Sequence, residues 1–269
     1  MKISECKLGF IGFGHMAQVI CQALLQAKLI PNANIQFIRR DAAKSKAAEQ
    51  KLRVTATSMD RLIETSDILV IAVRPNQIEP VLKDLVRCRG QSKMIVTVLA
   101  GVPFKTYQNH LGENPQIVRV MPNIASAVSE GMSVFSYLPN ATPDFRSLTN
   151  LLFSCMGETV EVSEKLMDIS TAIAGSGPGF IFRLIDAMAR VGEKEGLQYE
   201  KALKMAAQTF AGAARLILKG SDPEVLIEQI ATPNGVTEAG FKMMTSSGIE
   251  KQLQEVVLAS AQRSKELSS

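Results

Sequence analysis

The sequence is poor in the residues that metal sites and histidine-based catalysis need. Its four cysteines are scattered and include no C-x-x-C pair, and the whole chain has only two histidines. Without paired cysteines or histidines to partner them, no zinc or other metal site is predicted. The same cysteine pattern favours a reducing compartment.

Long apolar runs and clusters of a single charge are also missing. No signal peptide precedes the first predicted strand, and no apolar run is long enough to span a bilayer. The net charge of +4 is mild and forms no basic tract, so nothing points to nucleic-acid binding, although it would suit an anionic cofactor and substrate. We therefore expect a cytoplasmic protein with neither a membrane nor a nucleic-acid partner.

The clearest motif lies at the N-terminus. Residues 8–17 are typical of a short apolar strand, a glycine turn and the start of a helix at His15. The spacing Gly12-x-Gly14-x-x-Ala17 fits the G-x-G-x-x-G/A dinucleotide fingerprint. Gly12 would allow the tight turn, and Gly14 would let the backbone approach a pyrophosphate. The free amides at the helix start would hold the phosphates.

The end of the second predicted strand, residues 34–40, bears on the choice of cofactor. It carries Arg39 and Arg40, and the acidic Asp41 comes only after them, as the expected N-cap of the next helix. An arginine here accommodates the 2′-phosphate of NADP, whereas an acid binds the free 2′-hydroxyl of NAD. We therefore predict NADP(H), with NAD(H) as the second candidate. Two solvated arginines at a strand end are the alternative interpretation.

Strands and helices continue to alternate as far as residue 162, with Ser58 and Thr142 as further expected helix N-caps. This alternation predicts a doubly wound, Rossmann-like α/β domain over residues 1–163. The segments 72–76, 99–102 and 121–123 each follow a predicted strand. Because ligands bind at the carboxyl ends of such strands, these loops should line the same cleft as the glycine turn.

From residue 164 to residue 269 only helices are predicted, which gives an all-α second domain. Several of its faces are apolar at once, and a helix that is apolar nearly all round must be buried. A partner subunit would cover these faces; a self-contained bundle is the alternative. Two glycine-bearing turns stand out, residues 171–180 as a break between two helices and residues 232–237 just before a helix. Each is a candidate carboxylate site or a simple interhelical turn.

Seven short motifs span nearly the whole chain: Gly9-Phe-Ile-Gly-x-Gly-x-Met16-Ala17, Ala72-Val73-Arg74-Pro75, Ala100-Gly101-Val102, Arg119-Val120-Met121-Pro122-Asn123, Gly175-Ser176-Gly177-Pro178, Pro233-x-Gly235-x-Thr237 and Arg263-Ser264-x-Glu266-Leu267. Through these motifs the chain resembles the pyrroline-5-carboxylate reductase family. This resemblance implies NADPH-dependent reduction of the cyclic imine 1-pyrroline-5-carboxylate to L-proline, the last step of proline biosynthesis. It also implies homodimers through intertwined C-terminal helices, often assembled further into decamers.

The resemblance also assigns site residues. The substrate carboxylate would lie on the backbone amides of Gly235, Val236 and Thr237, beside Asn234, and Thr171 would line the same pocket. The Thr237 hydroxyl, near the ring nitrogen, is the predicted catalytic group. With the two arginines included, the expected cofactor-binding residues are Gly12, Phe13, Gly14, His15, Met16, Arg39, Arg40, Ala72, Val73, Arg74, Pro75, Val98, Leu99, Ala100 and Asn123.

Some positions depart from the family pattern. Asn234 replaces a glycine, Ala174 replaces a usual serine, and Gly179-Phe180 replaces Ala-Tyr. Asparagine tolerates the left-handed backbone that such a turn needs. These departures bear on the identity of the substrate more than on the class of reaction. Two alternatives stay open: a reductase of another cyclic imine acid, and a catalytically silent NADPH-binding regulatory paralogue.

The histidines also favour an imine over a ketone as substrate. His15 lies in the phosphate turn and His110 in a polar segment after a helix, so neither is predicted to be catalytic. A 2-hydroxy acid dehydrogenase needs a positioned base, whereas a protonated cyclic imine already carries its proton. A β-hydroxyacid dehydrogenase relies on a lysine in a glycine-rich helical motif. Here the first lysine after Gly175-Ser176-Gly177-Pro178 is Lys194, which is too distant for that role.

Overall fold

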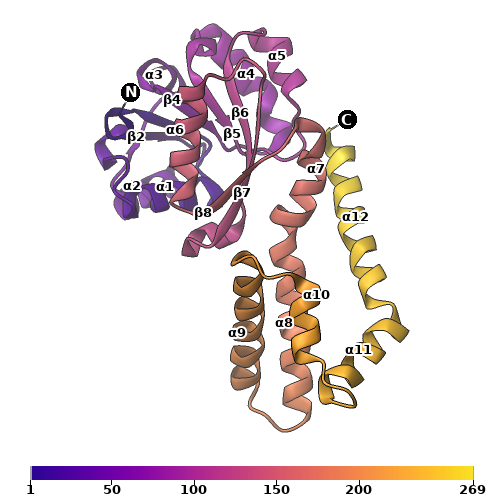
Figure 1. The fold of residues 1–269 in the computed structure, drawn as a ribbon. Coiled ribbons are helices and arrows are strands. Elements are labelled where there is room, and N and C mark those ends of the chain that lie inside the picture. The colour runs from indigo at the N-terminus through magenta and orange to yellow at the C-terminus, as the bar shows by residue number, and fades with distance from the viewer. Residues whose placement is uncertain (1, 269) are drawn as a thin grey trace. The chain divides into compact units, whose positions relative to one another are not determined.

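The computed structural model describes residues 2–268, which form two compact units (Figure 1). The N-terminal unit comprises residues 2–176 together with residues 260–268, and the helical unit comprises Gly177–Ala259. The predicted domains, residues 1–163 and 164–269, divide the chain where strands give way to helices, and the compact units divide it at other residues. The predicted domains stay a prediction.

A single eight-stranded sheet organises the N-terminal unit. Its strand order is β3-β2-β1-β4-β5-β6-β7-β8; β6 and β7 pair antiparallel, and the other neighbours pair parallel. The order 3-2-1-4-5-6 is that of a doubly wound dinucleotide-binding sheet, which confirms the predicted fold class. The strands are β1 (Leu8–Ile11), β2 (Ile35–Ile38), β3 (Thr55–Ala56), β4 (Ile68–Ile71), β5 (Met94–Thr97), β6 (Gln116–Met121), β7 (Gly131–Tyr137) and β8 (Gly157–Glu161).

Helices cover both faces of this sheet, as the side chains of β4 show. Ile68 and Val70 pack in one apolar cluster, and Leu69 and Ile71 pack in another on the opposite face. A strand buried on both faces needs apolar residues at every position, which explains the unbroken run in β4. The first cluster includes residues of α1 (His15–Gln26), α2 (Ala42–Leu52) and α6 (Pro143–Ser154), and the second includes residues of α3 (Met59–Thr65), α4 (Ile78–Arg87) and α5 (Phe104–Leu111).

The expected helix starts are confirmed by their caps. The side chains of Asp41, Ser58 and Thr142 each accept a hydrogen bond from the backbone amide three residues further on. In this way each cap satisfies an amide that has no partner inside its own helix.

The prediction that His110 lies in a polar segment after a helix is wrong, because this residue is part of α5. Phe104, Tyr107 and Leu111 recur at helical spacing and are buried against the sheet, which accounts for the helix. The His110 Nε2 lies 3.1 Å from the Glu79 carboxylate. His110 is thus a residue of a surface helix.

The prediction of a break between two helices over residues 171–180 is also wrong. Helix α7 (Met167–Ser170) runs directly into the π-helical segment Thr171–Ser176, which continues into α8 (Gly177–Lys194). Pro178 has no N–H to donate to the Ala174 carbonyl four residues earlier. That carbonyl instead accepts a hydrogen bond from the Asn123 side chain, at 3.0 Å. The hydrogen bond that Pro178 cannot donate within the helix is therefore supplied by a side chain from a distant part of the sequence.

Within the described chain, the helical unit buries few side chains. Only Ala189, Ala202 and Ala206 are buried in it, while Phe182 and Leu218 are 58% and 71% exposed. Between residues 2 and 268, no helix combines the length and the apolar character that crossing a membrane requires. After α8 come α9 (Tyr199–Leu218), α10 (Pro223–Ile230), α11 (Val236–Ser247) and α12 (Ile249–Ser268), whose last residues from Ser260 onward belong to the N-terminal unit.

Candidate active site

A cavity of about 740 Å³ lies at the carboxyl ends of β1, β2 and β4. We refer to it as the glycine-turn cavity. It occupies the point where strand order reverses, between β1 and β4, which is the usual ligand site of doubly wound sheets. Its lining consists of residues 11–17, residues 38–41, Lys44, Met59, residues 72–74, Gln77, Pro80, Val81, Asp84 and Val98.

The structure requires glycine at only one of the two glycine positions of the fingerprint. Gly12 has a φ of +87°, and a Cβ there would lie 2.7 Å from the Ala72 carbonyl oxygen. The fold itself therefore requires glycine at this position. Gly14 has an ordinary extended φ of −79°, and a Cβ there would meet no atom of the described residues within 4 Å. Only a ligand that approaches the backbone closely would need glycine at position 14.

The start of α1 is built to receive an anion. Gly14 is its N-cap and offers no capping side chain, and the first turn contains no acidic residue. The first amides of a helix have no partner within the helix, and the helix dipole is positive at this end. His15 and Met16, which carry the first of these amides, are among the residues that line the glycine-turn cavity. The geometry fits the pyrophosphate of a dinucleotide.

Arg39 braces the glycine turn as well as lining the cavity. Its Nη1 donates to the Phe13 carbonyl at 2.9 Å, and the Gln18 Nε2 donates to the same oxygen at 3.2 Å. The Phe13 ring is buried and stacks on Phe37, with the ring centroids 4.2 Å apart. Phe13 therefore presents its backbone to the cavity, whereas Arg40 is exposed at the strand tip.

Lys44 also lines the cavity, although it was not predicted from the sequence. It lies in the first turn of α2, next to the strand tip, and its Nζ is 3.5 Å from the Asp41 carboxylate. The backbone amide of Lys44 donates to Asp41, which lowers the pKa of that carboxyl and keeps it charged. The sequence could have indicated Lys44, because it lies three residues after the predicted cap Asp41. A residue in this first turn of α2 is close to the tip of β2, where Arg39 and Arg40 lie.

Four of the expected cofactor residues, Pro75, Leu99, Ala100 and Asn123, do not line the glycine-turn cavity. Leu99 is buried in the apolar cluster beneath α4 and α5. The side-chain oxygen of Asn123 accepts hydrogen bonds from the backbone amides of Ala125 and Met132, while its Nδ2 donates to Ala174. The other eleven residues of the expected set surround the cavity together, and all of these assignments stay predictions.

Thr171 opens the π-helical segment, where its Oγ1 donates to the Met167 carbonyl at 2.7 Å. Its methyl group faces Gly175 across one turn, 3.7 Å from the position of a Cβ there. π-Helical turns often occur at functional sites. The predicted contact of Thr171 with the substrate stays a prediction.

The second glycine-bearing turn precedes α11 in the helical unit. Asn234 has a φ of +58°, so it does adopt the left-handed conformation that its place in the turn requires. The Gly235 amide donates to the Thr232 carbonyl at 2.9 Å, and a Cβ on Gly235 would lie 2.3 Å from the Thr232 Oγ1. The Gly235 amide is thus engaged by the turn. The following amides, of Val236 and Thr237, open helix α11 and have no partner within it.

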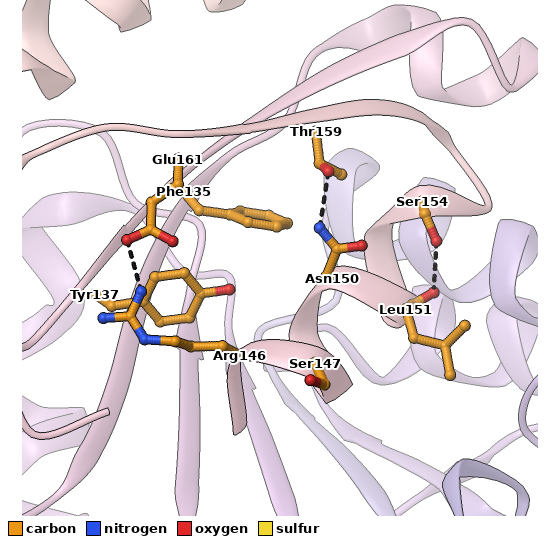
Figure 2. Close-up of a pocket in the computed structure, with 9 residues that line it drawn as sticks. All are labelled: Phe135, Tyr137, Arg146, Ser147, Asn150, Leu151, Ser154, Thr159 and Glu161. Carbon is orange, nitrogen blue, oxygen red and sulfur yellow. Dashed lines mark hydrogen bonds and ion pairs between the residues drawn. The ribbon is translucent and has the colours of Figure 1, made fainter. Parts of the chain in front are cut away.

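A different cavity, of about 630 Å³, lies beside β7, β8 and α6 and contains none of the predicted site residues (Figure 2). Four of its polar side chains are paired with one another. The Arg146 Nη1 donates to the Glu161 carboxylate at 2.6 Å, and its guanidinium carbon lies 4.4 Å from the centre of the Tyr137 ring. Asn150 likewise donates to Thr159. This internal pairing engages both charged side chains of the lining.

Comparison with known proteins gives matches along the whole chain. A family model for pyrroline-5-carboxylate reductase dimerisation matches residues 164–267, and one described as NADP oxidoreductase coenzyme F420-dependent matches residues 7–101. The pyrroline-5-carboxylate reductase of Methanosarcina acetivorans is 38% identical over 264 residues, 97% of either chain. That of Arabidopsis thaliana is 34% identical and covers 97% of this chain and 95% of its own. The crystal structure of Plasmodium falciparum pyrroline carboxylate reductase with NADP bound has a TM-score of 0.89 at 26% identity, covering 99% of this chain and 100% of that one.

Proposed function

The chain belongs to the pyrroline-5-carboxylate reductase family, and we propose that it reduces 1-pyrroline-5-carboxylate to L-proline with NADPH, the last step of proline biosynthesis. The observation that carries this proposal is the glycine-turn cavity, where uncapped helix amides and a basic strand tip meet at the switch point of the sheet. Anionic phosphates match both features.

We assign the parts of the cofactor to the residues that suit them. The amides at the start of α1 hold the pyrophosphate, for which Gly14 leaves room. Arg40 and Lys44, on the exposed side of the strand tip, take the 2′-phosphate, while Arg39 also braces the turn. When bound, NADPH supplies the hydride that reduces the imine carbon.

The chain contributes mainly orientation to the reaction. A protonated cyclic imine already carries its proton and an electrophilic carbon, so no general base is needed to start the reaction. We assign the substrate carboxylate to the amides of Val236 and Thr237, which open α11, and a hydrogen bond at the ring nitrogen to the Thr237 hydroxyl. Holding reactants in an attack geometry accounts for much of an enzyme's acceleration.

We propose that the active form is a homodimer built through the helical unit and, at the next level, a decamer. The helical unit buries three alanines and leaves large apolar side chains such as Phe182, Met205 and Leu218 exposed. A surface of this kind is stabilised when a partner covers it. We also propose a cytoplasmic location, in line with four cysteines that are all free thiols.

Rescue of a proline-requiring cell tests the enzyme against the silent NADPH-binding paralogue. Expression of this chain in cells that lack their own pyrroline-5-carboxylate reductase is expected to restore growth without proline. Expression of Thr237→Ala at the same level serves as the matched control and is expected to restore growth poorly. Normal protein levels without growth would favour the paralogue.

A comparison of ring sizes tests the second alternative. We expect the purified chain to turn over the five-membered imine acid at least about tenfold more efficiently than the six-membered one, since a missing or added methylene changes binding by about 1–3 kcal/mol. Faster turnover of the six-membered ring would identify another cyclic imine acid as the substrate.

A further inference from the structure

A charged side chain is buried beside the sheet, at a position to which the proposed function gives no role. Arg119 lies in β6, and its side chain is only 6% exposed. Its guanidinium carbon lies 5.9 Å from the centre of the Phe104 ring, and its Nε has no hydrogen-bond partner among residues 2–268. A buried cation is costly unless it is paired. The group that pairs with Arg119 therefore decides whether this buried cation is tolerated.

The partner of Arg119 is Glu164, from a distant part of the chain. One carboxylate oxygen of Glu164 accepts two hydrogen bonds: from the Arg119 Nη1 at 2.8 Å and from the Phe104 backbone amide at 2.6 Å. Phe104 is the first residue of α5, and its N-cap, Pro103, has no side-chain acceptor. Glu164 thus caps α5 from sixty residues away, with its negative charge at the positive end of the helix dipole.

The segments that this carboxylate joins are those next to the expected site. Residues 98–103 form the loop between β5 and α5; this loop begins at Val98 in the lining of the glycine-turn cavity. Glu164 begins the helical run that contains Met167 and then Thr171. Ala100 and Met167 also belong to one small apolar cluster with Met121. The ion pair and this cluster therefore hold the same two segments together.

We propose that Arg119 and Glu164 are positioning residues of the reaction: they fix the loop 98–103 against the start of the helical run that contains Thr171, so that the hydride-donating end of the cofactor is held in one geometry. This inference rests on the proposed function. Neither residue touches the reacting atoms. Arg119 fixes where the Glu164 carboxylate lies, and Glu164 fixes where α5 and its preceding loop begin.

The chain offers a matched control for testing this pair. Arg146 and Glu161 form a second Arg–Glu bridge in the same unit, at 2.6 Å, and Glu161 lies in the cavity without predicted site residues (Figure 2). Glu164 and Glu161 are both partly exposed, with side chains 37% and 54% accessible, so either can be replaced with less risk to folding than Arg119. The comparison uses Glu164→Ala, Glu164→Gln and Glu161→Ala in the full-length protein.

For Glu164→Ala we expect kcat/KM for the imine to fall by about tenfold to a hundredfold, because small misplacements of reacting groups cost that much. The Kd for NADPH should change by less than about twofold, since the phosphates are held by other residues. Glu164→Gln keeps an acceptor for the Phe104 amide and should recover part of the loss. Glu161→Ala should leave kcat/KM unchanged.

Hydrogen exchange of the Phe104 amide gives a readout that does not depend on activity. Its protection should be lost in Glu164→Ala and retained in Glu164→Gln and Glu161→Ala. The inference is overturned if Glu164→Ala lowers kcat/KM no more than Glu161→Ala does. It is equally overturned if kcat/KM and the NADPH Kd worsen by the same factor along with Tm. A wild-type protein without imine reduction would instead refute the proposed function, while the exchange experiment would still report on the contact.

Discussion

Replacing Gly14 with alanine should weaken cofactor binding without destabilising the fold. The fold should tolerate this change, because Gly14 has an extended backbone and a Cβ would meet no atom of the described residues within 4 Å. Alanine is a somewhat poorer N-cap than glycine, but it also lowers the entropy of the unfolded chain. These effects oppose each other, so the free energy of unfolding should change by no more than about 0.5 kcal/mol.

The loss should appear in cofactor affinity. The new methyl group would stand in the open space before the uncapped amides of α1, where we place the pyrophosphate. Losing one hydrogen bond to a charged group costs about 1.5–3 kcal/mol, which corresponds to a rise in the NADPH Kd of roughly 10- to 150-fold. Titration of NADPH fluorescence measures the Kd, and thermal unfolding without cofactor measures stability.

Gly12→Ala is the matched control, because it makes the same chemical change two residues earlier. At φ +87°, and with the Ala72 carbonyl oxygen 2.7 Å from the added Cβ, this variant should lose at least about 1–2 kcal/mol of stability. If Gly14→Ala binds NADPH within about twofold of wild type, the pyrophosphate does not lie at these amides. If it destabilises the fold as much as Gly12→Ala does, the distinction between the two glycines is wrong.

Three further perturbations test other parts of the account. Arg40→Ala should weaken NADPH about tenfold and leave NADH nearly unaffected, as judged from kcat/KM with each cofactor; a wild-type preference for NADH would contradict the interpretation of the strand tip. Thr237→Ala should slow imine reduction about tenfold or more, whereas unchanged rate and affinity would exclude its hydrogen bond to the substrate. Hydrogen bonds from Arg87 hold the pKa of Asp60 below its usual value, so the stability this pair contributes is present at neutral pH and lost as pH falls through that lowered pKa. Asp60→Asn should therefore be less stable than wild type by urea unfolding at pH 7, and this difference should shrink as the pH falls through the lowered pKa of Asp60; a difference that stays constant over the acid range would count against the pair.

Much of the α/β unit could be predicted because its signals are local. The apolar run of β4 and the capping residues Asp41, Ser58 and Thr142 each lie next to the structure they specify. His110 was placed after a helix and not inside one, because the sequence of α5 is largely polar and its buried side chains are only three. The spacing of Phe104, Tyr107 and Leu111 was the signal that could have included His110 in this helix.

The parts that could not be predicted depend on contacts between distant residues. The π-helical segment Thr171–Ser176 receives a hydrogen bond from Asn123, and α5 is capped by Glu164. No local pattern encodes either contact, since each joins residues more than fifty positions apart. The same limit applies to Arg119, which is an ordinary strand residue in the sequence and a buried cation in the fold.

The central claim is that this chain transfers hydride from NADPH to a five-membered cyclic imine acid. The most direct measurement follows NADPH oxidation by the purified protein with 1-pyrroline-5-carboxylate and quantifies L-proline in the same samples, with NADH in parallel. We expect one proline to be formed for each NADPH consumed, with NADPH preferred over NADH. NADPH binding without any proline formed would contradict it.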